Sequence, residues 1–323
     1  MKHRRLITLT LLFCLPVFAA VFSQEQSSLD SILPLGAKME KITGDTPFDT
    51  AGSPCYFRGI LYFTNNNFDD LQKSRVMKMD NPGGVQIIRP NNGMTATLKP
   101  NRAGNLFACE MMGHRIVEMD STGKVLRVVV GEYNGKRIDG PNDLVIDRKG
   151  GFYFTDSQFI GKKQKMQDKP AIYYVTKGGA VTRVADDVLF PNGLGLSLDG
   201  KTLFVANTQG KYLLAYDVAA NGSLSNRRNF AELKISKENI AKKSEMSGAD
   251  GLAVARTGDV YVATTQGFGI QVFDKTGKHL GNISCPAPTN NCSFGGKDMR
   301  TLYVSAKDGI YSIRTRTVGF RSF

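Results

Sequence analysis

The sequence predicts an all-β fold, a six-bladed β-propeller. The main support is a short apolar phrase of strand-forming residues that occurs six times, 42 to 57 residues apart, at positions 61–64, 106–109, 152–155, 203–206, 260–263 and 302–305. A strand repeat of about 40 to 50 residues is typical of propellers, in which each repeat forms one sheet that cannot bury its faces alone. A β-sandwich with coincidental spacing is the alternative, and the regular phase of the copies favours the propeller.

Each phrase belongs to a longer pattern of strands. In the third copy a strand-like run at 144–147 precedes the phrase, and a turn with Lys149 and Gly150 separates the two. Glycine-containing turns between alternating apolar runs indicate hairpins. Two more runs follow, at 171–175 and 181–184. Each copy therefore predicts one sheet of four antiparallel strands.

The first residues indicate a targeting segment. Lys2, Arg4 and Arg5 precede an apolar run at 6–22, which is the pattern of a secretory signal peptide at residues 1–23. A retained membrane anchor is the alternative, although the apolar run is a little short for a membrane span. We therefore expect an exported protein, periplasmic or secreted, with no stable membrane anchor.

The rest of the chain is long enough for one closed propeller. We expect residues 24–49 to form an N-terminal lead-in and part of the ring closure, and residues 50–323 to form the propeller itself.

The net charge of +13 favours anionic surroundings or partners. However, no basic run is interleaved with aromatic residues, and the lysines at 162–169 fall in one predicted loop, as in a solvated basic loop. We therefore expect no nucleic-acid partner.

The cysteines and histidines exclude some types of chemistry. In an oxidising exterior Cys285 and Cys292 could pair across a loop of six residues. No Cys or His spacing suggests zinc, and neither His114 nor His279 has a recognisable nucleophile nearby in the sequence. A Ser-His-Asp or Cys-His catalytic system is therefore poorly supported.

Polar residues recur where the first strand of a copy begins. Asn142, Asn192 and Asp250 stand 10 or 11 residues ahead of their phrases, and Asn291 stands 11 ahead of the last one. The innermost strands of a propeller surround the central channel, so these positions should converge at one mouth of it. Their oxygens are ligands that calcium prefers. We expect Asn192 and Asp250 to bind the metal, Asn142 to border it and Asp143 to face the substrate; the alternative is that these residues only cap turns.

The chain resembles the family of senescence marker protein (regucalcin), gluconolactonase and luciferin-regenerating enzyme. The residues that carry the resemblance lie at 140–147, 151–156, 190–193, 199–203, 249–252 and 291–296. The resemblance implies a six-bladed propeller with one divalent metal ion in the channel mouth, calcium or else magnesium, manganese or zinc, and hydrolysis of sugar lactones. It also implies that Asn192 and Asp250 are metal ligands, that Asn142 and Asp143 form the metal-adjacent and substrate-binding pair, and that Asp250 handles the proton.

The chain departs from the family pattern at three places. The first copy has Gly52 and Ser53 where the family usually supplies a Glu ligand, which removes one negative charge from the metal shell. Met111 follows Glu110 where a His is usual, and Gly140 stands where some members have an Arg. Because calcium affinity depends on the number of charged ligands, we expect weaker metal binding than in a complete site.

These observations predict an exported, metal-dependent hydrolase of sugar lactones, with a small-molecule lactone or sugar acid as its partner. A noncatalytic propeller that binds carbohydrate or protein is the alternative, because the usual Glu ligand is absent. A propeller like strictosidine synthase is a third possibility, which the Asn and Asp positions make less attractive.

Overall fold

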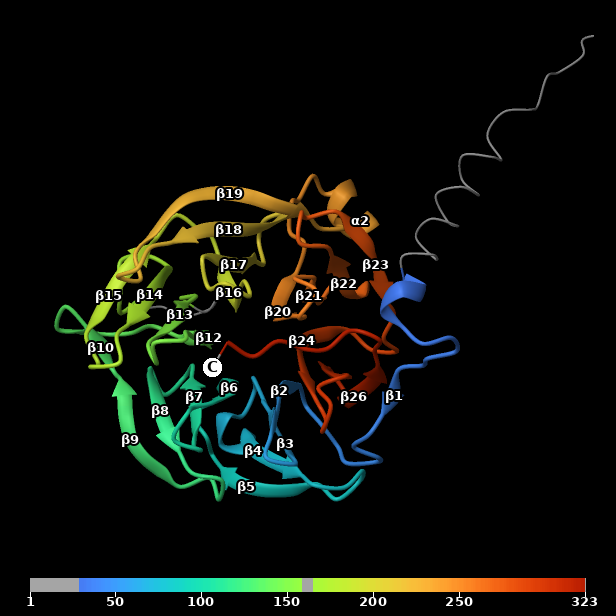
Figure 1. The fold of residues 1–323 in the computed structure, drawn as a ribbon. Helices are drawn as coiled ribbons and strands as arrows, with labels where there is room; N and C mark the ends of the chain where they lie inside the picture. The colour runs from blue at the N-terminus through green and yellow to red at the C-terminus, as the bar shows by residue number, and fades with distance from the viewer. Residues whose placement is uncertain (1–28, 159–164, 323) are drawn as a thin grey trace, which may run out of the picture.

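The computed structural model describes residues 29–158 and 165–322, and the expected signal peptide at 1–23 lies outside the described residues. Six four-stranded antiparallel sheets surround a central channel like the blades of a propeller (Figure 1). The predicted all-β, six-bladed fold is confirmed.

The blades follow one another along the chain. Blades 1 to 3 consist of β2 (Ala51–Phe57), β3 (Ile60–Asn65), β4 (Arg75–Met79) and β5 (Gln86–Pro90); β6 (Thr95–Pro100), β7 (Leu106–Glu110), β8 (Arg115–Met119) and β9 (Val125–Val130); and β12 (Pro141–Ile146), β13 (Phe152–Asp156), β14 (Ala171–Val175) and β15 (Val181–Ala185). Blades 4 to 6 consist of β16 (Pro191–Leu196), β17 (Thr202–Asn207), β18 (Tyr212–Val218) and β19 (Leu224–Glu232); β20 (Ala249–Val254), β21 (Val260–Thr264), β22 (Gly269–Phe273) and β23 (His279–Ile283); and β24 (Thr289–Gly295), β25 (Thr301–Ala306), β26 (Gly309–Arg314) and β1 (Glu40–Lys41). The connections contain the hairpin of β10 (Glu132–Tyr133) and β11 (Lys136–Arg137), a 3₁₀ turn, η1 (Leu71–Lys73), and a short helix, α2 (Lys237–Ala241).

The repeated apolar phrase is the second strand of every blade. Both faces of this strand are covered by neighbouring blades, so its residues are apolar without alternation. Between blades 2 and 3, for example, the rings of Phe107 and Phe152 lie 5.3 Å apart, and Phe154 packs in the same cluster. The core therefore consists of wedges of side chains between adjacent sheets.

The sixth blade combines a strand from the beginning of the described chain with three strands from its end. Its outer strand, β1, pairs with β26, with Glu40 opposite Ser312 and Lys41 opposite Tyr311. Ile32, which precedes β1, is buried in the core cluster of blades 5 and 6. The ring is thus closed by a strand that comes from before the first blade.

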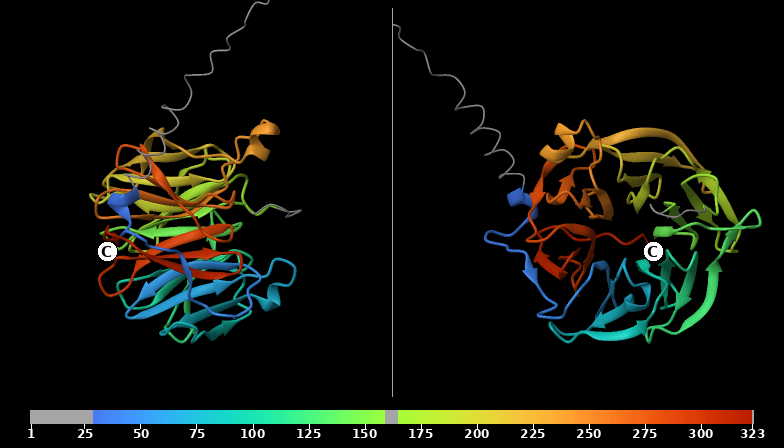
Figure 2. Two further views of the ribbon diagram at one scale, coloured as in Figure 1. Left: turned by 90° about the vertical axis from the view of Figure 1, so that its right-hand side faces the viewer. Right: turned by 180° about the vertical axis from the view of Figure 1, so that it is seen from behind.

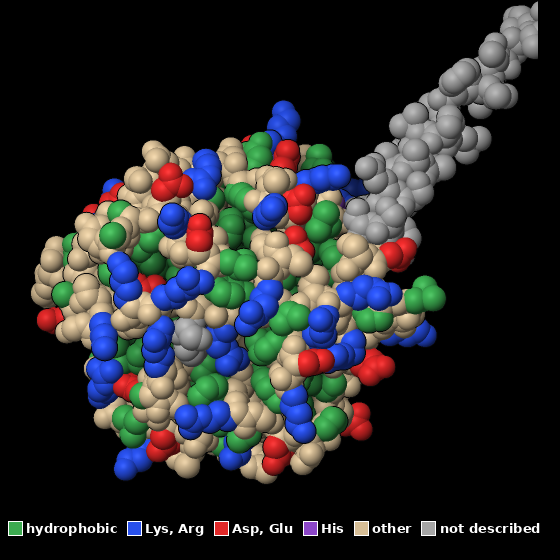
Figure 3. All heavy atoms as spheres, in the orientation of Figure 1, with side chains coloured by type: hydrophobic (Ala, Val, Ile, Leu, Met, Phe, Trp, Pro, Cys, Tyr) green, Lys and Arg blue, Asp and Glu red, His purple; other side chains and the backbone are tan. Residues whose placement is uncertain are grey.

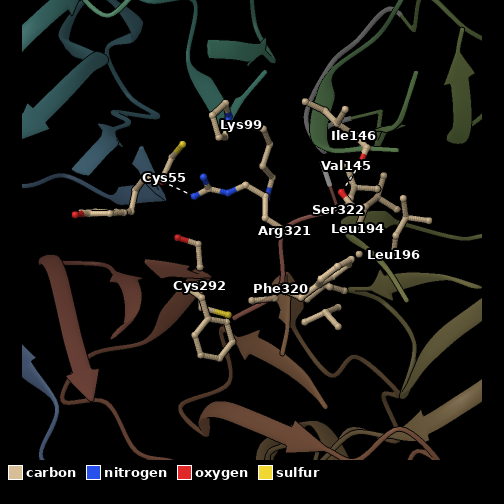
Figure 4. Close-up of a pocket in the computed structure, with 18 of the residues that line it drawn as sticks. Cys55, Lys99, Val145, Ile146, Leu194, Leu196, Cys292, Phe320, Arg321 and Ser322 are labelled. Carbon is tan, nitrogen blue, oxygen red and sulfur yellow. Dashed lines mark hydrogen bonds between the residues drawn. The ribbon is translucent and has the colours of Figure 1, made fainter. Parts of the chain in front are cut away.

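The C-terminal residues cross one end of the channel, as Figures 2 and 4 show. Gly319 bridges to Ala255, and the backbone N–H of Phe320 donates to the carbonyl of Val254 at 2.8 Å. Arg321 extends toward blade 1 and donates to the carbonyl of Tyr56 at 2.6 Å, while Ser322 contacts Ile146 in blade 3. A cavity of only about 110 Å³ remains at this end of the channel.

The structure does not contain the disulfide that the spacing of Cys285 and Cys292 allowed. All four described cysteines are free thiols. Cys292 lies on the innermost strand β24, where its thiol is buried and points to the carbonyl of Tyr261, 3.6 Å away, whereas Cys285 lies in the loop beyond β23. The two side chains therefore belong to different environments.

The face of the molecule seen in Figure 3 is mixed in charge. Lys and Arg side chains are spread over this face, with Asp and Glu side chains among them. No helix in the described part of the chain is long and apolar enough to cross a membrane.

Candidate active site

A β-bulge at the start of each innermost strand forms the site. In blade 3 the pairing shifts between Pro141, opposite Asp156, and Leu144, opposite Phe154, and the other five blades show a shift at the same place. A bulge adds one residue to a strand and redirects its side chain. The residues that follow the first paired position, called the inner ring here, are Gly52, Ala96, Asn142, Asn192, Asp250 and Asn290.

All six inner-ring residues line one cavity of about 380 Å³. It opens at the end of the channel opposite the C-terminal residues, because the inner ring lies at the beginnings of the innermost strands and the C-terminal residues contact their ends. The structure thus places Asn142, Asn192 and Asp250, from three successive blades, on the wall of the same cavity.

A second set of residues surrounds the inner ring. These outer-ring residues each follow the second strand of a blade, and five of them line the cavity: Asn66, Met111, Thr208, Thr265 and Lys307. Thr208 shows what this position can do. Its hydroxyl donates to the carbonyl of Ala249 at 2.7 Å and accepts from the side-chain amide of Asn192 at 3.0 Å. Thr208 therefore fixes which end of the Asn192 amide points to the cavity.

Asn192 and Asp250 have the properties of cation ligands. The Asn192 Oδ1 atom is buried and has no hydrogen-bond partner, which is costly for a buried acceptor. Burial raises the pKa of Asp250 from 3.8 to about 8, the negative charge of Asp143 adds to this rise, and a hydrogen bond from Asn192 opposes it. A cation beside both oxygens would satisfy the amide and compensate the carboxylate.

The close approach of blades 4 and 5 brings these two residues together. A Cβ atom on Gly193 would lie 2.3 Å from the carbonyl oxygen of Asp250, so only glycine fits. Among residues 29–158 and 165–322, no three His, Cys, Asp or Glu side chains form a group that could hold a metal ion. A cation in this cavity would therefore depend on amide oxygens as well as on Asp250.

The structure does not bring Asp143 to the cavity. Its side chain is 1% exposed, and its two oxygens accept from the backbone N–H groups of Leu144, at 2.8 Å, and Leu194, at 3.0 Å. The Nζ atom of Lys99 lies 3.5 Å from the same carboxylate. The expectation that Asp143 faces the substrate therefore needs correction, because Asp143, the second residue of the bulge, points into the seam between blades 3 and 4.

A protein-family model matches most of the chain. Residues 50–308 match the model of the SMP-30/gluconolactonase/LRE-like region. The chain belongs to this family. It is 26% identical over 319 residues to a gluconolactonase of Zymomonas mobilis, a match that covers 90% of this chain and 85% of the relative. It is also 28% identical over 276 residues to regucalcin of Bos taurus, with coverage of 83% and 85%.

Solved structures agree with this assignment. A gluconolactonase from Xanthomonas campestris superposes with a TM-score of 0.76 at 25% identity, over 90% of this chain and 93% of the other. A regucalcin from Agrobacterium tumefaciens, described as a calcium-binding protein, gives a TM-score of 0.68 at 20% identity, over 87% and 95% of the two chains. The second likeness shows the fold alone.

In this SMP-30/gluconolactonase/LRE-like chain, blade 1 supplies no carboxylate to the cavity. Gly52 holds its inner-ring position, and the hydroxyl of Ser53 accepts from the backbone N–H of Leu98 in blade 2 at 2.6 Å. Ser53 therefore joins two blades in the same way as Asp143 does. Neither Gly52 nor Ser53 therefore supplies the carboxylate that a Glu in blade 1 would provide.

The sequence pattern missed Asn290. Counting back from the last phrase pointed to Asn291, but the bulge places Asn290 in the inner ring, where its amide donates to the carbonyl of Ala51 at 2.6 Å. Asn291 also lines the cavity, and its Oδ1 atom accepts from the backbone N–H of Cys292 at 2.8 Å. The one-residue difference follows from the pairing register, which spacing alone does not reveal.

Proposed function

We propose that this protein is an exported, metal-dependent hydrolase of sugar lactones. The family supports lactone hydrolysis, since its relatives include a gluconolactonase, a pentonolactonase and a lactonohydrolase. The observation that carries the metal dependence is the unpartnered Oδ1 atom of Asn192 in the same cavity as the partly buried carboxylate of Asp250. The alternative of a noncatalytic binding propeller is not favoured by these relatives.

Asn192 and Asp250 would hold the divalent ion, with Asn142 at its edge. We propose calcium, and magnesium, manganese or zinc are the other candidates. When bound, such an ion polarises a carbonyl group and lowers the pKa of a water molecule. Blade 1 contributes no charge to this shell, so we propose weaker binding than in a site with two carboxylates.

The residues of the chain supply the rest of the reaction. Water adds to the carbonyl carbon of the lactone, the ring C–O bond breaks, and the product is an open-chain hydroxy acid. Asp250 accepts the proton of the attacking water and returns it to the alkoxide that leaves the ring. Asn142 lines the same cavity and presents an amide that can donate and accept hydrogen bonds with the hydroxyl groups of a sugar ring.

A lactone panel tests this function. Protein without residues 1–23 is purified, stripped of metal, and assayed against five- and six-membered aldonolactones with and without added calcium. We expect ring opening that chelator abolishes and calcium restores. Lactone turnover that is equally fast in chelator would contradict the metal dependence, and no turnover of any lactone would contradict the enzyme assignment.

Export rests on the sequence of residues 1–23 and has its own test. In cells that express the full chain, N-terminal sequencing of the accumulated protein should find a start near Gln24, in the periplasm or the medium. A product in the cytoplasm that retains residues 1–23 would contradict export.

A further inference from the structure

The wall of the cavity differs in polarity from one blade to the next. Blades 3 to 6 each place a polar side chain in the inner ring: Asn142, Asn192, Asp250 and Asn290. Blades 1 and 2 place only Gly52 and Ala96 there. In the outer ring, Met111 of blade 2 is apolar, whereas the other cavity-lining members are Asn, Thr and Lys. Among the described residues, the blade 2 side of the wall therefore offers no polar side chain.

Three residues make up the blade 2 wall: Met94, Ala96 and Met111. Met94 and Met111 are 1% and 6% exposed, and the backbone N–H of Met111 donates to the carbonyl of Met94 at 3.1 Å. This hydrogen bond holds the two residues against each other. Methionine side chains are flexible and polarisable, so they adapt to apolar ligands of different shapes.

Phe68, in the loop after β3 of blade 1, is a further apolar residue of the cavity lining. It is 51% exposed although it is a large apolar side chain, and it lines the same cavity. Its loop is braced by Asn67, whose Oδ1 atom accepts from the backbone N–H groups of Asp69 and Asp70 at 3.0 and 2.6 Å. An aromatic ring held in this exposed place gains stability when a ligand covers it.

The chemistry of this wall does not suit a fully hydroxylated ring. Each sugar hydroxyl pressed against Met94, Ala96 and Met111 would lose its water without gaining a protein partner, which costs free energy. An alkyl or acyl group in the same place would instead bury apolar surface.

We propose that Phe68, Met94, Ala96 and Met111 form an apolar subsite for a substituent of the substrate. The preferred substrates are then lactones that carry an alkyl or acyl group, with the lactone ring toward Asn192 and Asp250 and the substituent toward blade 2. This inference rests on the proposed lactonase function and specifies its substrate class.

A series of substrates tests the proposal. The kcat/KM values of γ-lactones with unbranched alkyl substituents of one to six carbons are compared with that of δ-gluconolactone. We expect kcat/KM to rise about three- to fourfold per methylene over the first few carbons, as expected for burial of CH₂ groups. Turnover of δ-gluconolactone together with a flat or falling alkyl series would overturn the subsite and leave the lactonase function intact.

A matched pair of variants locates the effect. Met111→Gln places an amide in the subsite, and Met112→Gln makes the same change one residue away, outside the cavity-lining residues. We expect Met111→Gln to lower kcat/KM for the hexyl lactone at least tenfold, with a change of less than about threefold for δ-gluconolactone. Met112→Gln should leave both values unchanged. An equal loss for both substrates, or an equal effect of the two variants, would overturn the assignment.

Binding without turnover separates this inference from the function on which it rests. Alkyl γ-lactams have the shape of the lactones but are not readily hydrolysed, and their dissociation constants can be measured by calorimetry. We expect tighter binding with each added methylene in the unaltered protein and a weaker dependence in Met111→Gln. Chain-length-dependent lactam binding without lactone turnover would support the subsite and reject the hydrolase; affinities independent of chain length would reject the subsite.

Discussion

The carboxylate of Asp143 in blade 3 accepts a hydrogen bond from the backbone N–H of Leu194 in blade 4, across 3.0 Å. Thr155 reinforces this link, because its hydroxyl accepts from the N–H of Asp143 at 3.0 Å and donates to the carbonyl of Asn192 at 2.9 Å. Asn142 directly precedes Asp143 in the chain, and Asn192 accepts one of these hydrogen bonds through its backbone carbonyl. The seam between the two blades therefore sets the spacing of two cavity residues.

Asp143→Asn should lower both stability and metal affinity. The amide can accept only through one atom, so one of the two backbone N–H groups loses its partner, and Lys99 loses its ion pair. We expect a loss of about 2 kcal/mol in the free energy of unfolding, measured by urea denaturation. The double variant with Lys99→Met should recover part of this stability but not the calcium affinity measured by calorimetry. Unchanged calcium affinity in both variants would show that the seam does not position Asn192.

Asp250→Asn should abolish activity and severely weaken calcium binding while the fold persists. The substitution preserves shape but removes the only inner-ring carboxylate and the group that accepts the proton of water. Calorimetry measures the binding, and far-ultraviolet circular dichroism monitors the fold. Asp199→Asn, in a turn at the end of blade 4's innermost strand, is a surface control that should leave calcium binding unchanged. An unaltered calcium titration of Asp250→Asn would exclude this residue as a ligand.

The stability of the metal-free protein should decrease with pH. Burial raises the pKa of Asp250 from 3.8 to about 8, so the folded protein holds a proton that the unfolded chain has released. The contribution of Asp250 to the free energy of unfolding should therefore be fully present below about pH 4. This contribution should be lost as the pH rises toward 8. Asp250→Asn and saturating calcium should both flatten the profile. The check is a series of urea titrations across this range, and a profile with the same slope in Asp250→Asn would assign the effect to another group.

Thr208→Val should weaken metal binding although Thr208 is not a proposed ligand. The hydroxyl that accepts from the Asn192 amide is replaced by a methyl group of similar size, so the amide is no longer held with Oδ1 toward the cavity. Loss of such an orienting partner typically reduces metal affinity 10-fold or more. We expect about a tenfold rise in the calcium dissociation constant, whereas Thr208→Ser should retain most of the affinity. Equal affinities in the Val and Ser variants would argue against this orienting role.

Gly52→Glu should tighten metal binding by restoring a carboxylate in blade 1. The new Cβ atom would lie 2.7 Å from the hydroxyl of Thr64, so that side chain must shift. Gly52→Ala carries the same steric cost without the charge and is therefore the matched control. We expect a lower calcium dissociation constant in the Glu variant than in the Ala variant, measured by calorimetry. Equal constants would mean that position 52 does not face the ion.

The sequence was sufficient for the architecture because each second strand is covered on both faces. Burial on both sides requires continuous apolar residues, and this requirement made Leu61, Phe152 and Val260 recognisable as equivalent positions. Burial on both faces does not predict where the bulges lie. A bulge shifts a strand by one residue, and this shift separates Asn290 from Asn291 and turns Asp143 away from the cavity beside Asn142.

The crossing of the channel by the C-terminal residues could not be predicted from the sequence either. Residues 318–322 have no strand pattern, and their backbone bonds go to Val254, Arg256 and Met299 in blades 5 and 6. These contacts depend on the closed ring, so they can be recognised only once the ring is known. The apolar wall of blade 2 is a similar case, because Met94 and Met111 become neighbours only through the hairpin of β6 and β7.

The pairing of β1 with β26 means that the ring cannot close before the end of the chain has been synthesised. While the ribosome is still adding the last residues of β26, the first five sheets can already have formed, but they make an open arc with the inner strand of blade 1 uncovered. Only when Tyr311 and Ser312 have emerged can Glu40 and Lys41, synthesised long before, find their partners. Until then apolar surface of blade 1 stays uncovered, and such surface makes partly folded chains prone to associate.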